Sequence, residues 1–272
     1  MSSKRILLIT GANTGIGFET ARALLGSERP YHILLGSRSI DKGAAAISNL
    51  ESEFPSTTSS LELLQVDIVD DDSILKAFQS VKDKHGVLDV LVNNAGASYD
   101  FNPQNYNPED IKALRENFNK SYDVNTSGTH VITHVFAPLL LKSSDPRILF
   151  VTSGLSNLHG TETLGLWPFQ PQTVPPAGWP KPFTPQAAYR SSKAALNMVM
   201  LNWHWLLKAD GVKVWCISPG FLATNLGGNP ELLKKMGAGE PSRGGLIIKK
   251  VVEGEHDADV GKVVNKDGIQ PW

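Results

Sequence analysis

The sequence predicts an α/β fold: a doubly wound parallel sheet of about seven strands with helices on both faces. Two observations predict it. Short runs rich in leucine and β-branched residues recur along the 272 residues, and amphipathic stretches of helical length separate them. Several of these runs are nearly continuous in apolar residues, which is typical of strands that are buried on both faces.

The predicted strands and helices alternate along the chain. The strands are Arg5–Thr10, His32–Leu35, Leu61–Val66, Val87–Val92, Arg147–Thr152, Val212–Ile217 and Lys262–Val264. The helices are Gly17–Leu25, Asp41–Ser52, Asp71–Lys84, Asp110–Asn125, Thr129–Leu141 and Gln186–Ala209. With right-handed crossovers, this alternation predicts a Rossmann-type sheet in a single domain that spans 1–272.

Composition excludes several classes of partner. The 26 basic and 27 acidic residues leave a formal net charge of −1, which offers no general attraction for nucleic acid or for an anionic membrane. The apolar run Val135–Leu141 is far shorter than the roughly 18 residues that a membrane-spanning helix needs. We therefore expect a small-molecule ligand, with no nucleic acid, membrane or metal as a partner.

Cysteine usage indicates the compartment. Cys216 is the only cysteine, so the chain can form no intrachain disulfide, and its apolar neighbours predict a buried small hydrophobe. The early apolar run Ile6–Ile9 is too short for the core of a signal peptide. Both observations favour a reducing compartment, and we expect a cytoplasmic protein.

A glycine-rich turn, residues 10–17, follows the first strand and opens an amphipathic helix. Gly11 and Gly15 would let the backbone turn and approach a pyrophosphate, and Gly17 would let the helix pack close to the strand. The helix N-terminus would present unpaired N–H groups to phosphate. A glycine triad alone is weak evidence, but the strand–turn–helix setting favours a dinucleotide site over a merely structural turn.

The end of the second strand indicates which dinucleotide binds. An acidic residue about 20 positions beyond the glycines usually holds the adenosine ribose 2′-hydroxyl, whereas this chain has Ser37 and Arg38 there. A guanidinium matches the charge and geometry of phosphate, so NADP(H) is favoured over NAD(H). Two alternatives remain open: Arg38 is a solvent-facing loop charge, or Lys42 serves in its place.

A tyrosine and a lysine lie four residues apart on the last predicted helix. This spacing puts the Tyr189 phenol and the Lys193 ammonium on one face, where both can contact one ligand. A cation at about 4 Å contributes about 4 kcal/mol at an effective dielectric constant of about 20. Together with a positively charged nicotinamide, that would bring a phenol of ordinary pKa near 10 into working range. The spacing is common by chance on surface helices, so the interpretation depends on accompanying motifs.

Those motifs occur in a fixed order along the chain. After the glycine turn come Asn93-Asn94-Ala95-Gly96 at the end of the fourth strand, Asn125 in a helix, and Ser153 at the end of the fifth strand. The Tyr189/Lys193 pair and Pro219-Gly220 follow. In this order the chain resembles the short-chain dehydrogenase/reductase family over nearly its whole length.

The resemblance implies four catalytic residues. Tyr189 would be the general acid/base, and Lys193 would lower its pKa and hold the nicotinamide ribose. Ser153 would bind the substrate carbonyl oxygen, and Asn125 would position a water in the proton relay. For Asn125, a purely structural bond to backbone at a helix kink stays open.

The resemblance also implies cofactor contacts. Asp67 would hold the adenine amino group, Asn93 and Gly96 would line the adenosine ribose, and the segment from Pro219 to Thr224 would cradle the carboxamide. A cap on the strand end is the alternative for Asn93 and Asn94. The full expected set is Gly11, Asn13, Thr14, Gly15, Ile16, Gly17, Ser37, Arg38, Asp67, Ile68, Asn93, Asn94, Ala95, Gly96, Tyr189, Lys193, Pro219, Gly220, Leu222 and Thr224.

Within the family the chain looks most like carbonyl reductases. It carries a Pro-rich insertion at 154–185 with Gly178-Trp179-Pro180, a Pro-Gly segment that runs into Thr224-Asn225-Leu226, and a short tail ending in tryptophan. We also expect a substrate lid at about 221–240. The insertion would be a long ordered loop. In those reductases the enlargement covers the surface by which relatives dimerise, so we expect a monomer or a weak homo-oligomer.

The expected pocket is mostly apolar, which favours a hydrophobic or aromatic ketone, aldehyde or quinone-like substrate. The residues expected to face it are Tyr99, Phe101, Leu155, His159, Phe221, Leu226 and Met236, although packing in the core or lid is an equal alternative. The predicted function is an NADPH-dependent carbonyl reductase. Two alternatives are a reductase of imines or activated double bonds in a biosynthetic pathway, and a non-catalytic nucleotide-binding protein.

Overall fold

The structure is a computed structural model that describes residues 4–100, 107–164, 176–181 and 186–272. Its strands are β1 (Arg5–Ile9), β2 (Tyr31–Ser37), β3 (Ser60–Gln65), β4 (Val90–Asn93), β5 (Arg147–Val151), β6 (Lys213–Ile217), β7 (Val263–Asn265) and β8 (Gly268–Gln270). Its helices are α1 (Gly15–Leu25), α2 (Ile40–Glu53), α3 (Asp71–Lys84), α4 (Ile111–Tyr122), α5 (Thr129–Leu140), α6 (Leu158–Leu164), α7 (Ala187–Leu206), α8 (Pro230–Lys235) and α9 (Ser242–Glu253).

The strands form one sheet in the order β3-β2-β1-β4-β5-β6-β7-β8. All neighbouring pairs are parallel except β7 and β8. The order reverses direction beside β1, and at such a switch point the carboxyl ends of parallel strands leave a crevice for ligands. The doubly wound Rossmann-type fold predicted from the sequence is confirmed.

Two hydrophobic cores enclose the sheet, because successive strand residues face opposite sides. Leu8 packs into one core, with side chains of α3, α5 and α7, and its neighbours Leu7 and Ile9 pack into the other, with side chains of α1, α2 and α9. The near-continuous apolar strands are therefore buried on both faces, as expected.

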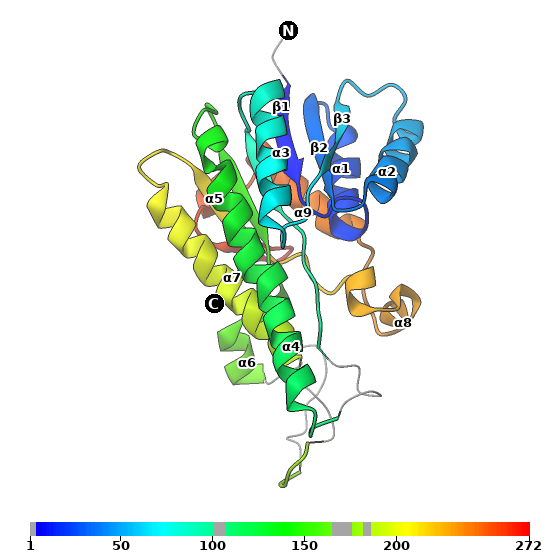
Figure 1. The fold of residues 1–272 in the computed structure, drawn as a ribbon, viewed down its shortest axis with the longest axis vertical. Coiled ribbons are helices and arrows are strands. Elements are labelled where there is room, and N and C mark those ends of the chain that lie inside the picture. The colour runs from blue at the N-terminus through cyan, green and yellow to red at the C-terminus, as the bar shows by residue number, and fades with distance from the viewer. Residues whose placement is uncertain (1–3, 101–106, 165–175, 182–185) are drawn as a thin grey trace.

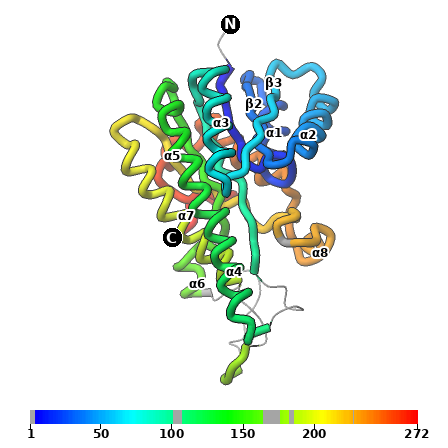
Figure 2. Tube along the Cα trace, viewed as in Figure 1, coloured from blue at the N-terminus to red at the C-terminus, as the bar shows by residue number. Residues whose placement is uncertain are grey.

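The ends of the sheet differ. The N-terminus enters at one end, and α4 and α6 extend beyond the sheet at the opposite end (Figure 1, Figure 2). α4 and α5 are joined by a π-helical turn, Asp123–Gly128, so that they form one continuous helical segment. The loops that follow the parallel strands gather at this end of the molecule, where the candidate site lies.

Several predicted elements need correction. The sequence did not predict β8, which forms an antiparallel hairpin with β7, nor α8 and α9. The pair Gly244-Gly245 has low helix propensity, so the sequence pattern does not predict α9. In the structure these glycines allow α9 to pack closely on α1, because a β-carbon on Gly245 would lie 2.3 Å from the carbonyl oxygen of Glu19. The insertion expected as a loop at 154–185 begins with a 3-10 turn, Gly154–Ser156, and helix α6, while 165–175 and 182–185 lie outside the described residues.

Candidate active site

The three glycines of the turn after β1 are required for different reasons. Gly11 (φ 62°) and Gly15 (φ 58°) adopt the left-handed conformation, which side chains disfavour. Gly17 has no such φ, but a β-carbon there would lie 2.5 Å from Nδ2 of Asn94 and 2.8 Å from the carbonyl oxygen of Gly11. The turn and the first helical turn are therefore packed more closely than any side chain at Gly17 would allow.

The N-terminus of α1 is left open to an anion. Its N-cap residue, Thr14, makes no side-chain capping bond, and the first turn holds no acidic residue. In α2 and α3, by contrast, Ser39 and Asp70 accept hydrogen bonds from the first-turn N–H groups. Free N–H groups and the positive end of the helix dipole suit a pyrophosphate, so these residues fit the dinucleotide that the motif implies.

Of the two asparagines at the end of β4, Asn94 bonds the glycine turn and Asn93 bonds helix α5. Nδ2 of Asn94 donates to the carbonyl oxygens of Thr10 (2.8 Å) and Gly11 (3.2 Å), and the N–H groups of Asn94 and Ala95 donate to Thr10 Oγ1. Nδ2 of Asn93 donates to Thr133 Oγ1 (2.9 Å). The two side chains thus fasten the end of β4, as in the alternative interpretation, and Gly96 remains exposed beside them.

The end of β2 separates the two residues expected to bind the cofactor phosphate. Ser37 is buried, and its hydroxyl donates to the carbonyl oxygen of Ser39 (2.8 Å). Arg38 is exposed and makes no hydrogen bond or ion pair to any described residue. Of Ser37 and Arg38, therefore, only Arg38 has a side chain that is available to bind a phosphate.

The residues after β3 form a compact turn. Oδ1 of Asp67 accepts from the N–H of Val69 (3.2 Å), and the N–H of Asp67 donates to Ser73 Oγ (2.9 Å). Ile68 is buried, and a β-carbon on Gly128 would lie 2.2 Å from its carbonyl oxygen. The structure therefore packs the turn that holds Asp67 directly against the helical turn that holds Asn125.

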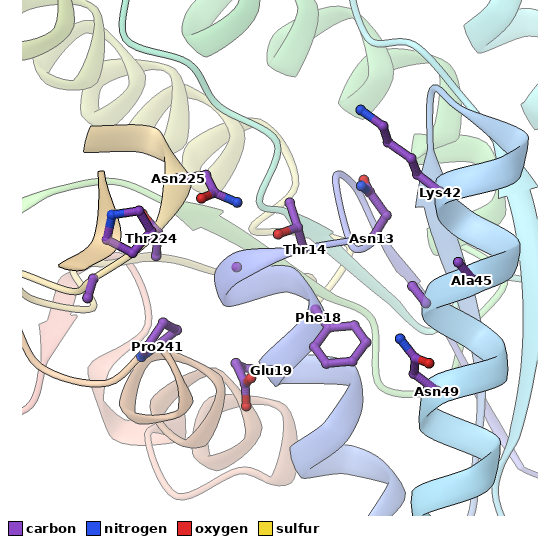
Figure 3. Close-up of a pocket in the computed structure, with 14 residues that line it drawn as sticks. Asn13, Thr14, Phe18, Glu19, Lys42, Ala45, Asn49, Thr224, Asn225 and Pro241 are labelled. Carbon is purple, nitrogen blue, oxygen red and sulfur yellow. The ribbon is translucent and has the colours of Figure 1, made fainter. Parts of the chain in front are cut away.

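A cavity of about 610 Å³ lies beside the glycine turn, between α1, α2 and the segment after β6. It is lined by Asn13, Thr14, Gly15, Phe18, Glu19, Lys42, Ala45, Ala46, Asn49, Ala223, Thr224, Asn225, Pro230 and Pro241. Figure 3 shows Asn13 and Lys42 on one side, with Thr14 and Asn225 between them and Thr224. The cavity borders the expected phosphate site, and none of the residues expected to face the substrate lines it.

The segment after β6 closes on itself. Pro219 is buried, Gly220 has a φ of 96°, and Leu222 pairs with Gly239 in a short parallel bridge. A β-carbon on Gly15 would lie 3.8 Å from the Thr224 methyl group, so this segment faces the glycine turn. The expected lid at 221–240 is thus a loop that carries α8 and is fastened at its base.

Ser153 and Tyr189 meet at the carboxyl end of β5. Tyr189 is buried, at 8% exposure, and its phenol forms a side-chain hydrogen bond with Ser153. The Ser153 hydroxyl also accepts from the N–H of Leu155 (3.1 Å). Burial raises the pKa of Tyr189 above its ordinary value, and the hydrogen bond with Ser153 lowers it in part. In the protein alone the phenol is held protonated, ready to donate.

Lys193 lies on the same helix as Tyr189 and is also buried, at 3% exposure. Its Nζ donates to the carbonyl oxygen of Val151 (2.8 Å) and would lie 3.2 Å from a β-carbon on Gly96. Burial lowers the pKa of Lys193 to about 8. The ammonium is therefore placed under the strand end that precedes Ser153 and next to the exposed Gly96.

Asn125 is fully buried inside the π-helical turn. Its Oδ1 accepts from the N–H of Ala97 (2.9 Å), and its Nδ2 donates to the carbonyl oxygen of Ala97 (2.8 Å) and to Ser192 Oγ (3.0 Å). π-Helical turns occur often at functional sites. Here the turn lets one amide join the loop after β4 to α7.

The residues expected to face the substrate are scattered. Tyr99, Leu155 and Phe221 are half-buried near the strand ends, whereas His159, Leu226 and Met236 are exposed. Phe101 lies outside the described residues.

The sequence analysis did not predict two groups at this site. The first is the pair Gln270 and Trp272 near the C-terminus. Gln270 donates to the carbonyl oxygen of Ser153 (3.3 Å), and the Trp272 carbonyl oxygen accepts from the N–H of His159 (2.8 Å). The second group is Asp100, whose carboxylate accepts hydrogen bonds from the first turn of α7. No local motif marks either group, because both act on residues that are far away in the sequence.

No helix within the described ranges has the length and apolar character needed to cross a membrane.

A family model described as short chain dehydrogenase matches residues 5–164, more than half of the chain. The short-chain dehydrogenase/reductase tropE of Talaromyces stipitatus is 48% identical over 281 residues, covering 100% of this chain and 99% of its own. The short-chain dehydrogenase/reductase eupG of Phoma sp is 44% identical over 281 residues, covering 99% and 98%.

Among solved structures, the NADPH-bound carbonyl reductase from chicken fatty liver superimposes with a TM-score of 0.76. The two proteins are 24% identical, and the match covers 99% of each chain. At this level of identity the likeness shows a shared fold, and that fold is the one found in a carbonyl reductase.

Proposed function

The chain belongs to the short-chain dehydrogenase family, and on that premise we propose that it is an NADPH-dependent reductase of carbonyl groups in hydrophobic small molecules. The observation that carries the proposal is that the Tyr189 phenol meets Ser153 at the carboxyl end of β5, one helical turn from the buried ammonium of Lys193, which donates to the carbonyl oxygen of Val151. This arrangement can hold and protonate an oxygen, which is what a carbonyl needs when it accepts a hydride.

NADPH, when bound, supplies the hydride. The glycine turn and the open N-terminus of α1 would hold its pyrophosphate, and Lys193 would hold the nicotinamide ribose. The Ser153 hydroxyl would donate to the substrate oxygen and polarise the carbonyl. Tyr189 would then release its proton to that oxygen as negative charge develops, so that no charge stays unshielded.

The charge of Lys193 supports this transfer. A phenolate left on Tyr189 would be stabilised by the positive charge of Lys193 on the same face of α7. Asn125 would act indirectly, because its side chain is committed to Ala97 and Ser192. Its contribution would be to hold the loop after β4 against α7, the helix that carries Lys193.

The proposal favours NADPH over NADH because of Arg38. Its guanidinium is exposed and makes no hydrogen bond or ion pair to a described residue. Lys42, four positions further along the chain, lines the cavity beside the glycine turn. Both cations would attract a 2′-phosphate, and β2 ends without the acidic residue that would repel it.

The proposed substrate is a hydrophobic ketone, aldehyde or quinone-like molecule, because Tyr99, Leu155 and Phe221 lie half-buried near the strand ends. We further propose a cytoplasmic monomer or weak homo-oligomer. The thiol of Cys216 is fully buried and would stay reduced. A stable tetramer in light scattering would contradict the monomer.

The proposal is tested by following NADPH consumption with a panel of ketones, aldehydes and quinones, and separately with imines and conjugated double bonds. Turnover confined to carbonyls is expected. Tyr189→Phe should lower kcat at least about 100-fold, because positioned proton donation is worth about 10²–10⁴ in rate. The matched control, Tyr122→Phe on α4, should keep full activity. Full activity in Tyr189→Phe, or tight NADPH binding without turnover of any carbonyl, would contradict the proposal.

A further inference from the structure

Helix α7, which carries Tyr189 and Lys193, does not cap its own N-terminus. Its N-cap residue is Gln186, whose φ of 51° makes it the one non-glycine residue with positive φ in the described parts of the chain. The Gln186 side chain makes no capping hydrogen bond. The N–H groups of the first turn therefore need an acceptor from elsewhere.

Asp100 supplies both acceptors from the loop after β4. Its Oδ1 accepts from the N–H of Ala188 (2.9 Å) and its Oδ2 accepts from the N–H of Tyr189 (2.8 Å). These are the two helical positions that an N-cap side chain normally serves. The bonds span 88 and 89 residues of sequence, and the negative charge also suits the positive end of the helix dipole.

Asp100 belongs to a segment that is fastened at three points. At residue 94 the asparagine holds the glycine turn, at Ala97 both backbone polar groups are bonded by Asn125, and at residue 100 the carboxylate holds α7. The segment 94–100 thus connects the expected cofactor turn, the π-helical turn and the helix of the tyrosine. A displacement at its end would be transmitted to the backbone of Tyr189.

We infer that Asp100 is a positioning residue for Tyr189: it fixes the backbone nitrogen of the residue whose phenol meets Ser153. The inference rests on the proposed reductase function. Without the carboxylate, the first turn of α7 would fray, and the phenol would lose its fixed direction toward Ser153. Misplacement of a reacting group by about 1 Å can cost about 100-fold in rate.

The rival explanation is that Asp100 is only a helix cap and contributes stability alone. The chain offers a matched control, because Asp110 caps α4 through the same kind of bond, accepting from the N–H of Ala113 (2.9 Å). Asp110 is exposed and contacts none of the proposed catalytic residues. Loss of either cap should lower the melting temperature, whereas only loss of Asp100 should change catalysis.

The test compares Asp100→Ala, Asp100→Asn and Asp110→Ala in the full chain. We expect kcat to fall about tenfold or more in Asp100→Ala, with the dissociation constant for NADPH within about twofold of the parent. Asp100→Asn should lie between, because the amide is uncharged and only one of its two terminal atoms can accept a hydrogen bond, so a single oxygen must serve both N–H groups. Asp110→Ala should keep the parental kcat. A kcat for Asp100→Ala within about twofold of that of Asp110→Ala would overturn the inference.

A second readout does not depend on turnover. Hydrogen exchange at the amides of Ala188 and Tyr189 should accelerate in Asp100→Ala and stay unchanged in Asp110→Ala. Unchanged exchange in Asp100→Ala would overturn the inference even if activity fell. If the parent protein turns over no substrate, the proposed function fails and the catalytic inference fails with it, while the exchange result still decides whether Asp100 anchors α7.

Discussion

The ammonium of Lys193 donates a hydrogen bond to the main-chain carbonyl of Val151, 2.8 Å away, at the end of the strand that leads to Ser153. The lysine is fully enclosed by protein, and burial lowers its pKa to about 8 from an ordinary value of 10.5. The proposed chemistry thus needs a positive charge on Lys193, and the burial of that charge lowers the stability of the folded protein.

The first prediction concerns that cost. Between pH 8 and pH 10.5 the folded protein binds fewer protons at Lys193 than the unfolded chain, so this group makes stability rise with pH in that window, and the penalty is complete below pH 8. The pKa shift corresponds to a destabilisation of about 3 kcal/mol. Replacing Lys193 by methionine removes this destabilisation but also removes the hydrogen bond to Val151, which contributes about 1 kcal/mol of stability. Lys193→Met should therefore stabilise the protein by about 2 kcal/mol at pH 7 while abolishing turnover.

Urea unfolding of Lys193→Met and the parent at pH 7 and pH 10 measures this effect. The advantage of the variant should shrink at pH 10. Lys76→Met, at an exposed position of α3, serves as the control and should show little dependence on pH. A Lys193→Met protein that is less stable than the parent at pH 7 would refute the prediction.

The second prediction separates the two cations near the expected 2′-phosphate. A hydrogen bond to a charged group contributes about 1.5–3 kcal/mol, which is about tenfold to a hundredfold in affinity. Arg38→Glu should lower the ratio of kcat/KM for NADPH to kcat/KM for NADH by that factor. Lys42→Glu should change the ratio less, because Arg38 directly follows the end of β2 whereas Lys42 is the third residue of α2. If only Lys42→Glu changes the ratio, Lys42 rather than Arg38 reads the phosphate.

The third prediction concerns the packing of the glycine turn. Gly17→Ala places a β-carbon 2.5 Å from Nδ2 of Asn94 and 2.8 Å from the Gly11 carbonyl oxygen, so the turn must shift. We expect a loss of about 1–3 kcal/mol of stability and at least about tenfold weaker NADPH binding by fluorescence titration. The control is Gly26→Ala at the end of the same helix, where the nearest atom would be 3.4 Å away. Equal cofactor affinity in the two variants would show that the turn tolerates a side chain.

The fourth prediction concerns an ion-pair network at the other end of the sheet. Asp257 receives hydrogen bonds from Arg147 and Lys213, and the Arg147 bonds are the main reason that its pKa falls to about 2. A lowered carboxylate pKa contributes stability above pH 4, and this is lost as the pH falls toward 2. Because about a third of its side chain is exposed to solvent, we expect Asp257→Asn to cost only about 1–2 kcal/mol at pH 7.

Thermal unfolding at pH 7 and near pH 2 tests the Asp257 prediction. The difference between Asp257→Asn and the parent should vanish at the lower pH. Asp267→Asn, which breaks an exposed pair with the adjacent Lys266, should change little at either pH. A difference that persists near pH 2 would show that the network stabilises the fold by something other than charge.

The parallel sheet, the glycine turn and the order of the site motifs followed from sequence because each depends on local pattern. Leu7, Leu8 and Ile9 make a strand that is apolar on both faces. The spacing of Gly17 from Gly11 and Gly15 is enough to predict that Gly17 lies where the helix packs closely on the turn. The strand β8 was missed because Gly268–Gln270 contains a single apolar residue, and helix α9 was missed because Gly244-Gly245 lowers helix propensity.

By itself the sequence determined that this protein has a Rossmann-type core with a dinucleotide-type turn, and that a tyrosine and a lysine share one helical face. Only the tertiary structure decided that Asn125 bonds to Ala97, that Lys193 is buried beneath Val151, and that Asp100 caps α7. The physical reason is range. Strand and helix patterns repeat every few residues, whereas these hydrogen bonds join residues 28 to 89 positions apart and exist only once the sheet brings its loops together.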